Sequence, residues 1–161
     1  MRLGDGAPAQ LSALGNLDLL ESPKIALFCS TRCPGAAILA AYDRAAHIRD
    51  AQSCVISGFH SPVEKECLCI LLRGTSPVII CPARALPKRL PPEWHKLLSN
   101  GRMLILSIFP VGVARTTGDL AAKRNEFVAA LADDVWFIHM TPGGQLERLS
   151  RRIVSWDIQK T

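Results

Sequence analysis

Short apolar runs recur along this chain, and most are followed by a polar loop and then by a segment with helical spacing. One run, Pro77–Cys81, is rich in β-branched residues, which favour strands. Continuous apolar runs of this length are typical of strands buried on both faces of a sheet. We predict strands at Lys24–Cys29, Ser53–Ile56, Pro77–Cys81, Met103–Leu106 and Val135–His139, and a further one at Ile153–Trp156.

Helical segments alternate with these strands. Pro62 suits the first turn of one of them, and the apolar residues Val63, Cys67 and Leu71 then share one face. We predict a helix at Leu11–Leu20, a second over an Ala-rich stretch that ends at about Asp50, and a third that begins at Pro62. Further helices are predicted at Glu93–Ser99, Asp119–Ala132 and Gln145–Arg152.

This alternation predicts an α/β fold of the Rossmann-like, doubly wound type, with a mainly parallel sheet of five to six strands and helices on both faces. We expect residues 1–23 to form an N-terminal extension with a short helix. Residues 24–161 are expected to form a single Rossmann-like domain.

Composition excludes several other classes of protein. The chain has 161 residues, of which 48% are hydrophobic and 20% charged, so it has too much apolar content to be intrinsically disordered. Its apolar runs are shorter than the ~20 residues that span a bilayer. The first residues lack the apolar core of a signal peptide. We therefore expect a cytoplasmic protein without a membrane partner.

Positive charge is concentrated in the second half of the chain. The net charge is +5, and Arg73–Arg152 holds twelve Lys and Arg against six Asp and Glu. Such a bias favours an anionic partner, a nucleotide or a nucleic acid, although a solvated surface with a modest charge bias explains it equally well.

The six cysteines do not form a recognisable metal or disulfide pattern. Cys29, Cys54 and Cys81 stand inside apolar segments, and neither a CxxC pair nor a zinc-like order with histidines occurs. We expect reduced, buried thiols, with no metal and no cofactor.

The loops after four of the predicted strands are rich in small and hydroxyl residues, namely Ser30-Thr31, Ser57-Gly58, Ser107 and Thr141-Pro142-Gly143-Gly144. In a parallel sheet such loops meet at one edge, where ligands bind and where helix N-termini favour phosphate. Ordinary turns and caps use the same residues. Neither GxGxxG nor GxxxxGK[ST] is present, which argues against a standard dinucleotide or nucleotide-triphosphate loop.

Arg124 occupies an unusual position in its helix. By spacing it belongs to the apolar face with Leu120, Phe127 and Leu131, so it must either extend to the rim or meet an anion at the sheet edge. Glu64 opens the helix after Pro62, where an acid suits the helix dipole.

These segments together resemble the DNA-processing protein family (DprA, also called Smf). Cys29-Ser30-Thr31-Arg32 is similar to the family's strand-ending Gly-Ser-Arg segment, and Val55-Ile56-Ser57-Gly58 matches its strand and Ser-Gly signature. Glu64 falls where the family has the acid of Gly-Ile-Asp, and Leu104-Ile105-Leu106-Ser107 resembles the strand before Ser-Glu. Arg124-Asn125 resembles the first part of an Arg-Asn-Arg motif.

The resemblance implies binding of single-stranded DNA or a nucleotide phosphate, a RecA-type recombinase as a partner, and a homodimer. The residues expected to bind phosphate are Ser30, Thr31, Arg32, Ser57, Gly58, Ser107, Arg124, Asn125, Pro142, Gly143 and Gly144. Lys88, Arg89 and Arg102 are expected to extend a nucleic-acid track.

Two alternatives stay open. Pro142-Gly143-Gly144 with Glu147 and Arg124 also resembles the constellation of the "lonely guy" cytokinin-activating proteins, which cleave nucleoside monophosphates with an arginine on the phosphate and a glutamate at the glycosidic bond. In that interpretation Arg124 and Glu147 are catalytic. The other alternative is a nucleotide-sensing or purely structural module without catalysis.

Overall fold

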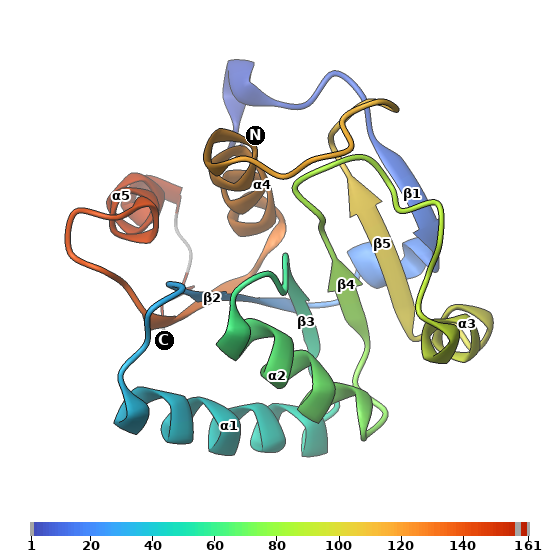
Figure 1. The fold of residues 1–161 in the computed structure, drawn as a ribbon, viewed down its shortest axis with the longest axis horizontal. Helices are drawn as coiled ribbons and strands as arrows, with labels where there is room; N and C mark the ends of the chain where they lie inside the picture. The colour runs from blue at the N-terminus through green and yellow to red at the C-terminus, as the bar shows by residue number, and fades with distance from the viewer. Residues whose placement is uncertain (1, 157–158, 161) are drawn as a thin grey trace.

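Five parallel strands form the centre of the sheet, each where an apolar run predicted one (Figure 1). The computed structural model describes residues 2–156 and 159–160, so the outermost residues of the predicted extension and domain lie outside the described residues. The central strands are β2 (Lys24–Cys29), β3 (Cys54–Ser57), β4 (Val78–Ile80), β5 (Met103–Ser107) and β6 (Asp134–His139). All residues of β3, β4 and β5 are buried, as expected for strands covered on both faces.

The order of the strands creates a point where the chain reverses direction. The sheet runs β1-β5-β4-β3-β2-β6-β7, so the chain steps outward from β2 to β5 and then crosses back to place β6 on the other side of β2. In α/β sheets, ligands bind at such a point, outside the carboxyl ends of the strands. Here that point lies between β2 and β6.

Helices cover both faces of the sheet (Figure 1). One face packs against α1 (Gly35–Asp50), α2 (Pro62–Leu72) and α3 (Pro92–Ser99), and the other against α4 (Gly118–Leu131) and α5 (Gln145–Arg152). Along β2 the side chains alternate between the two layers: Leu27 and Cys29 join the cluster with α1 and α2, whereas Ala26 and Phe28 join the cluster with α4 and α5. The predicted doubly wound, Rossmann-like class is confirmed.

The N-terminal segment differs from its prediction. The expected helix over Leu11–Leu20 is instead β1 (Ser12–Gly15), antiparallel to β5, followed by a short 3-10 helix at Leu17–Leu20. Gly15 has a φ of +112°, and a Cβ there would lie 2.3 Å from the Met103 carbonyl oxygen. Because an α-helix cannot contain that conformation, no helix runs through Gly15, and Ser12–Gly15 instead pair with the open edge of β5.

The end of the described chain also differs from its prediction. Ile153–Trp156, expected to be a strand, forms a 3-10 helix directly after α5. Ile153 is fully buried in the cluster beneath α5, so packing decides its conformation. A two-residue strand, β7 (Gln159–Lys160), then pairs in parallel with β6.

The cysteines serve mainly as core residues. Cys29, Cys54, Cys67 and Cys81 are buried free thiols, and burial raises the pKa of Cys67 to about 12, so the thiol stays protonated at neutral pH. Among residues 2–156 and 159–160, no three His, Cys, Asp or Glu side chains are grouped so that they could hold a metal ion. In the same residues, every helix is too short or too polar to cross a membrane.

Replacing Leu27 should show how much the central strand contributes to stability. Leu27 is 0% exposed, so Leu27→Ala leaves a cavity and should lower the free energy of unfolding by about 2–5 kcal/mol. Leu39 on α1 is 68% exposed, so Leu39→Ala should change the free energy of unfolding by less than about 0.5 kcal/mol. Urea denaturation of both variants measures the difference, and equal losses would contradict the assigned core.

Candidate functional site

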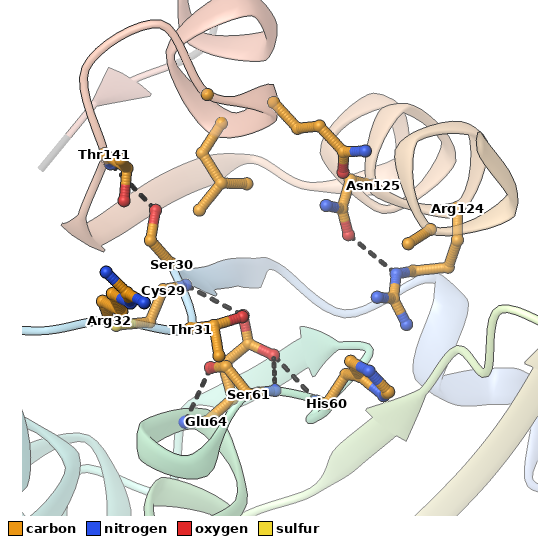
Figure 2. Close-up of a pocket in the computed structure, with 14 residues that line it drawn as sticks. Cys29, Ser30, Thr31, Arg32, His60, Ser61, Glu64, Arg124, Asn125 and Thr141 are labelled. Carbon is orange, nitrogen blue, oxygen red and sulfur yellow. Dashed lines mark hydrogen bonds between the residues drawn. The ribbon is translucent and has the colours of Figure 1, made fainter. Parts of the chain in front are cut away.

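A cavity of about 320 Å³ lies at the carboxyl ends of β2 and β6, where the chain reverses direction (Figure 2). We call it the crevice. It is lined by Cys29, Ser30, Thr31, Arg32, His60, Ser61, Glu64, Ala121, Arg124, Asn125, Thr141, Gly144, Gln145 and Leu146. The structure thus brings together the loops after β2, β3 and β6 and the residues Arg124 and Asn125 of α4, as the sequence predicted, and adds Ala121 of the same helix.

Ser30 joins the two loops on either side of the reversal point. Its backbone N–H donates to the His139 carbonyl at 2.9 Å, and its hydroxyl accepts from the Thr141 N–H at 2.9 Å. Thr31 and Arg32 follow and are exposed. Within the described part of the chain, the Arg32 guanidinium has no hydrogen bond or ion pair, so it is available to an anion.

Glu64 connects the ends of β2 and β3 (Figure 2). Its carboxylate is buried and accepts three backbone hydrogen bonds, from Cys29 and His60 at 2.8 Å and from Ser61 at 3.1 Å. The Ser61 hydroxyl in turn accepts from the Glu64 N–H at 3.4 Å, which completes a capping box. The sequence interpretation of Glu64 as an acid at a helix start holds, but it missed the contact with β2. The Ser-x-x-Glu spacing was the available signal for the cap.

Phe59 positions two of these donors. It has a φ of +46°, a strained conformation for a bulky residue, and its N–H donates to the Ser57 hydroxyl at 3.1 Å. The tight turn at Phe59 directs the N–H groups of His60 and Ser61 toward the Glu64 carboxylate. Strain is therefore located in the loop that borders the crevice.

Arg124 reaches from α4 across the ends of the central strands. It is only 4% exposed; its Nη1 donates to the Cys81 carbonyl at 2.8 Å and its Nε to the Asn125 side-chain oxygen at 2.7 Å. Burial lowers the pKa of Arg124, and the Glu64 carboxylate acts in the opposite direction, so the guanidinium stays charged. The sequence predicted that Arg124 either extends to the rim or meets an anion at the sheet edge. The structure places its guanidinium at the sheet edge, where it bonds to the backbone carbonyl of Cys81.

The guanidinium of Arg124 explains the glycine of the Ser-Gly pair. A Cβ at Gly58 would lie 1.7 Å from Nη1 of Arg124, a distance that no arrangement of these atoms permits. Gly58 therefore makes room for the buried cation. In the sequence prediction Gly58 binds phosphate, whereas the structure places it beneath Arg124.

Ser57 and Ser107 form matching turns at the ends of β3 and β5. Each hydroxyl donates to a backbone carbonyl, Ser57 to Leu27 at 2.7 Å and Ser107 to Arg84 at 2.6 Å. Each also accepts from the N–H two residues further on. Neither serine lines the crevice, so both have the turn-forming role that βα loops commonly give to serine.

The loop after β6 supplies different donors from those predicted. The Gly143 N–H donates to the Glu147 carboxylate at 2.7 Å and the Gly144 N–H to the Thr141 carbonyl at 2.9 Å, so both are already bonded. Pro142 and Gly143 do not line the crevice. The N-terminus of α5 has no side-chain cap, and its first residues, Gln145 and Leu146, do line it. Their backbone N–H groups are available to an anion.

The predicted track is divided between the two ends of the sheet. Lys88 and Arg89 lie in the segment between β4 and α3, on the same side as the crevice. Arg102 comes directly before β5, and its Nη2 donates to the Ser76 carbonyl at 3.2 Å. Because parallel strands share one direction, Arg102 lies at the amino ends, opposite the crevice.

The crevice as a whole favours an anion. Arg32, Arg124 and the N-terminus of α5 contribute positive charge or partial charge. Glu64 is the one acid among the described residues that line it, and its oxygens already accept three N–H groups. Glu147 lies outside the lining and pairs with Arg151 at 3.3 Å.

Comparisons with known proteins identify related chains. The family model for DNA recombination-mediator protein A matches residues 2–145. The solved structure of DNA processing protein A from Helicobacter pylori, which binds single-stranded DNA, is 20% identical, with a TM-score of 0.76 over 95% of this chain and 71% of that one. The corresponding structure from Streptococcus pneumoniae is 18% identical, with a TM-score of 0.65 over 96% of this chain and 64% of that one. No curated protein sequence matches significantly.

Substituting Gly58 tests whether it exists to accommodate Arg124. Gly58→Ala should displace the guanidinium, strain its bond to Cys81 and lower the free energy of unfolding by about 1–3 kcal/mol. In an Arg124→Ala background the obstacle is gone, so the same substitution should cost less than about 0.5 kcal/mol. Urea denaturation of the four-member cycle measures this coupling.

Gly35→Ala is the matched control, because a Cβ at Gly35 would meet no described atom within 4 Å. It should leave stability nearly unchanged. A cost for Gly58→Ala that is the same with and without Arg124 would contradict the proposed fit.

Proposed function

The chain belongs to the family of DNA recombination-mediator protein A, and on that premise we propose that it binds single-stranded DNA by its phosphates in the crevice. The observation that carries the proposal is the convergence of the exposed Arg32, the buried Arg124 and the start of α5, which has no side-chain cap, at the reversal point of the sheet. An arginine and backbone N–H groups are the usual ligands of phosphate.

The relatives and the charge distribution support this ligand. The Helicobacter pylori protein of the same fold binds single-stranded DNA. The segment Arg73–Arg152, with its excess of Lys and Arg, contributes Arg124, α5 and the Lys88-Arg89 segment to the same side of the sheet. A strand of nucleic acid carries a phosphate at every nucleotide, so it can use several of these cations at once.

Each residue has a distinct part in this proposal. Arg32 forms an ion pair with a phosphate, and the N–H groups of Gln145 and Leu146 donate to its oxygens. Ser30 holds the loops after β2 and β6 at a constant separation. Arg124 borders the site without being free to leave it, because its guanidinium is committed to Cys81 and Asn125. Contacts of this kind are independent of base sequence.

The geometry does not favour the hydrolase interpretation. That interpretation needs a glutamate beside the ligand, whereas the Glu147 carboxylate bonds to the Gly143 N–H and to Arg151 outside the crevice. A general acid or base must lie within hydrogen-bond reach of the group it serves.

Further parts of the proposal rest on family membership. We infer that the protein acts on DNA in the cytoplasm and that a RecA-type recombinase is its partner, in keeping with the description of the family as a recombination mediator. A homodimer remains a prediction from the resemblance, and sedimentation of the purified protein would test it.

Removing Arg32 should weaken DNA binding without affecting the fold. Log affinity for a labelled oligo(dT) should fall with log salt at a slope of about −0.7 per phosphate contacted, or roughly −2 to −3.5 for three to five contacts. Arg32→Ala removes one exposed cation, so it should cost about tenfold in affinity and reduce the slope by about 0.7. Fluorescence anisotropy across a salt series measures both quantities.

Arg73→Ala provides the matched control, since Arg73 is also exposed but lies at the end of α2, near the amino ends of the strands. It removes the same charge and should leave affinity within about twofold, because at 0.1 M salt the Debye length is only about 10 Å. Absence of binding at low salt, or equal losses for both variants, would refute the assignment of the crevice.

A further inference from the structure

Three cysteines gather where β2 ends and the loop toward α1 begins. Cys29 is the last residue of β2 and Cys67 lies on α2, and both are buried in the cluster that also contains residues of α1. Cys33 lies in the loop itself, is half-buried, and packs against the same cluster. The Cys29 thiol hydrogen-bonds to the Cys33 sulfur. A thiol that solvent reaches is therefore in contact with a buried one.

The contact selects Cys29 and Cys33 as a pair. The Cys33 thiol also approaches the Pro34 carbonyl, at 3.8 Å, so its own proton points away from Cys29 while its sulfur accepts. Only three residues separate the two cysteines, and the turn of the loop already brings their sulfurs together. Cys67 is 0% exposed and is not reached by solvent. Two thiols in contact have the arrangement from which a disulfide forms.

The two cysteines stand near the fixed ends of a short loop. At its start, the Cys29 N–H donates to the buried Glu64 carboxylate at 2.8 Å. At its end, the Pro34 carbonyl accepts from the Ile38 N–H at 3.0 Å in the first turn of α1. Arg32 lies between these ends and is exposed, and both Cys29 and Arg32 line the crevice (Figure 2). A bond between the cysteines would close a ring that contains Arg32.

We propose that Cys29 and Cys33 are a site of reversible oxidation, at which a hydroperoxide converts the two thiols into a disulfide that displaces Arg32 from the crevice. The oxidation itself stands on the thiol contact, whereas the effect of moving Arg32 rests on the proposed function. A disulfide needs sulfur atoms about 2.05 Å apart, closer than hydrogen-bonded thiols. Because Cys29 is held in the sheet, the movement falls on Cys33 and on Arg32 beside it.

Hydrogen peroxide, the simplest hydroperoxide, balances the reaction. Cys33 is the attacking group, because burial raises the pKa of the Cys29 thiol and keeps it protonated. The Cys33 sulfur loses its proton and bonds to one peroxide oxygen, the O–O bond breaks, and one water leaves. The Cys29 sulfur then attacks the sulfenic acid: the S–S bond forms, the S–O bond breaks, and the Cys29 proton leaves with the hydroxide as a second water. Two electrons pass from the thiols to the peroxide, and a dithiol reverses the bond by exchange.

Peptide mapping identifies the bond. The parent for all measurements is Cys69→Ser, which removes an exposed thiol on α2 that could link two molecules. Trypsin places Cys29, Cys33 and Cys67 on separate peptides, 25–32, 33–44 and 66–73. After hydrogen peroxide and alkylation of the remaining thiols, peptides 25–32 and 33–44 should be recovered joined, and dithiothreitol should separate them. A link from either of them to 66–73, or full alkylation of all three, would overturn the proposal.

DNA binding tests the displacement of Arg32. Oxidation of the parent should weaken binding of labelled oligo(dT) about 3- to 10-fold, through loss of one charge-assisted contact, and dithiothreitol should restore the affinity. Cys33→Ser in the parent should bind as the reduced parent does and should not respond to peroxide. In an Arg32→Ala background, oxidation should change the affinity by less than about twofold, because the cation that moves is already absent.

These results distinguish the proposal from the proposed function. A disulfide that leaves the affinity unchanged, or that weakens Arg32→Ala as much as the parent, would refute the displacement of Arg32. A loss of affinity in peroxide-treated Cys33→Ser would assign the effect to other oxidised groups and would also refute it. If the reduced parent does not bind oligo(dT) at low salt, the proposed function fails, while peptide mapping still decides whether Cys29 and Cys33 are an oxidation site.

Discussion

Two buried charges of opposite sign hold the carboxyl edge of this sheet together. Arg124 and Glu64 come from α4 and α2, which pack on opposite faces, and both charged groups lie among the ends of the central strands. Burying a charge is costly unless polar groups replace water. Here the backbone supplies those groups: the Cys81 carbonyl for Arg124, and the N–H groups of Cys29, His60 and Ser61 for Glu64. Each helix layer is thereby fastened to the strands at the edge where the crevice forms.

This arrangement makes the crevice rigid before any ligand arrives. Glu64 keeps the ends of β2 and β3 together, and the Ser30 hydroxyl keeps the loops after β2 and β6 together. A site whose loops are already ordered loses less entropy when it binds, which increases affinity without new contacts. Of the two arginines that line the crevice, Arg124 is already held by its hydrogen bonds to Cys81 and Asn125. The exposed Arg32 is therefore the arginine that the ligand must order.

The sequence predicted the elements well wherever the pattern of apolar residues was decisive. The strand over Lys24–Cys29 has the predicted ends, and the helix at Gln145–Arg152 does as well. The predictions failed at Leu11–Leu20 and Ile153–Trp156, because the open edge of β5 and the packing beneath α5, both set by distant residues, decide those conformations. The meeting of three loops at one edge followed from the fold class. The fold class did not predict which N–H groups of these loops are free to bind a ligand. The hydrogen bond from the Gly143 N–H to the Glu147 carboxylate, for example, depends on the detailed course of the loop.

The strand order also determines when this crevice comes into existence. β2 is flanked on one side by β3, which follows it directly along the chain, and on the other by β6, which is synthesised after β3, β4 and β5. Contacts between distant segments form late, because the loop between them must first be closed. The wall of the crevice that comes from the loop after β6 and from α5 is therefore the last to be synthesised, and the crevice is complete only when β6 has paired with β2.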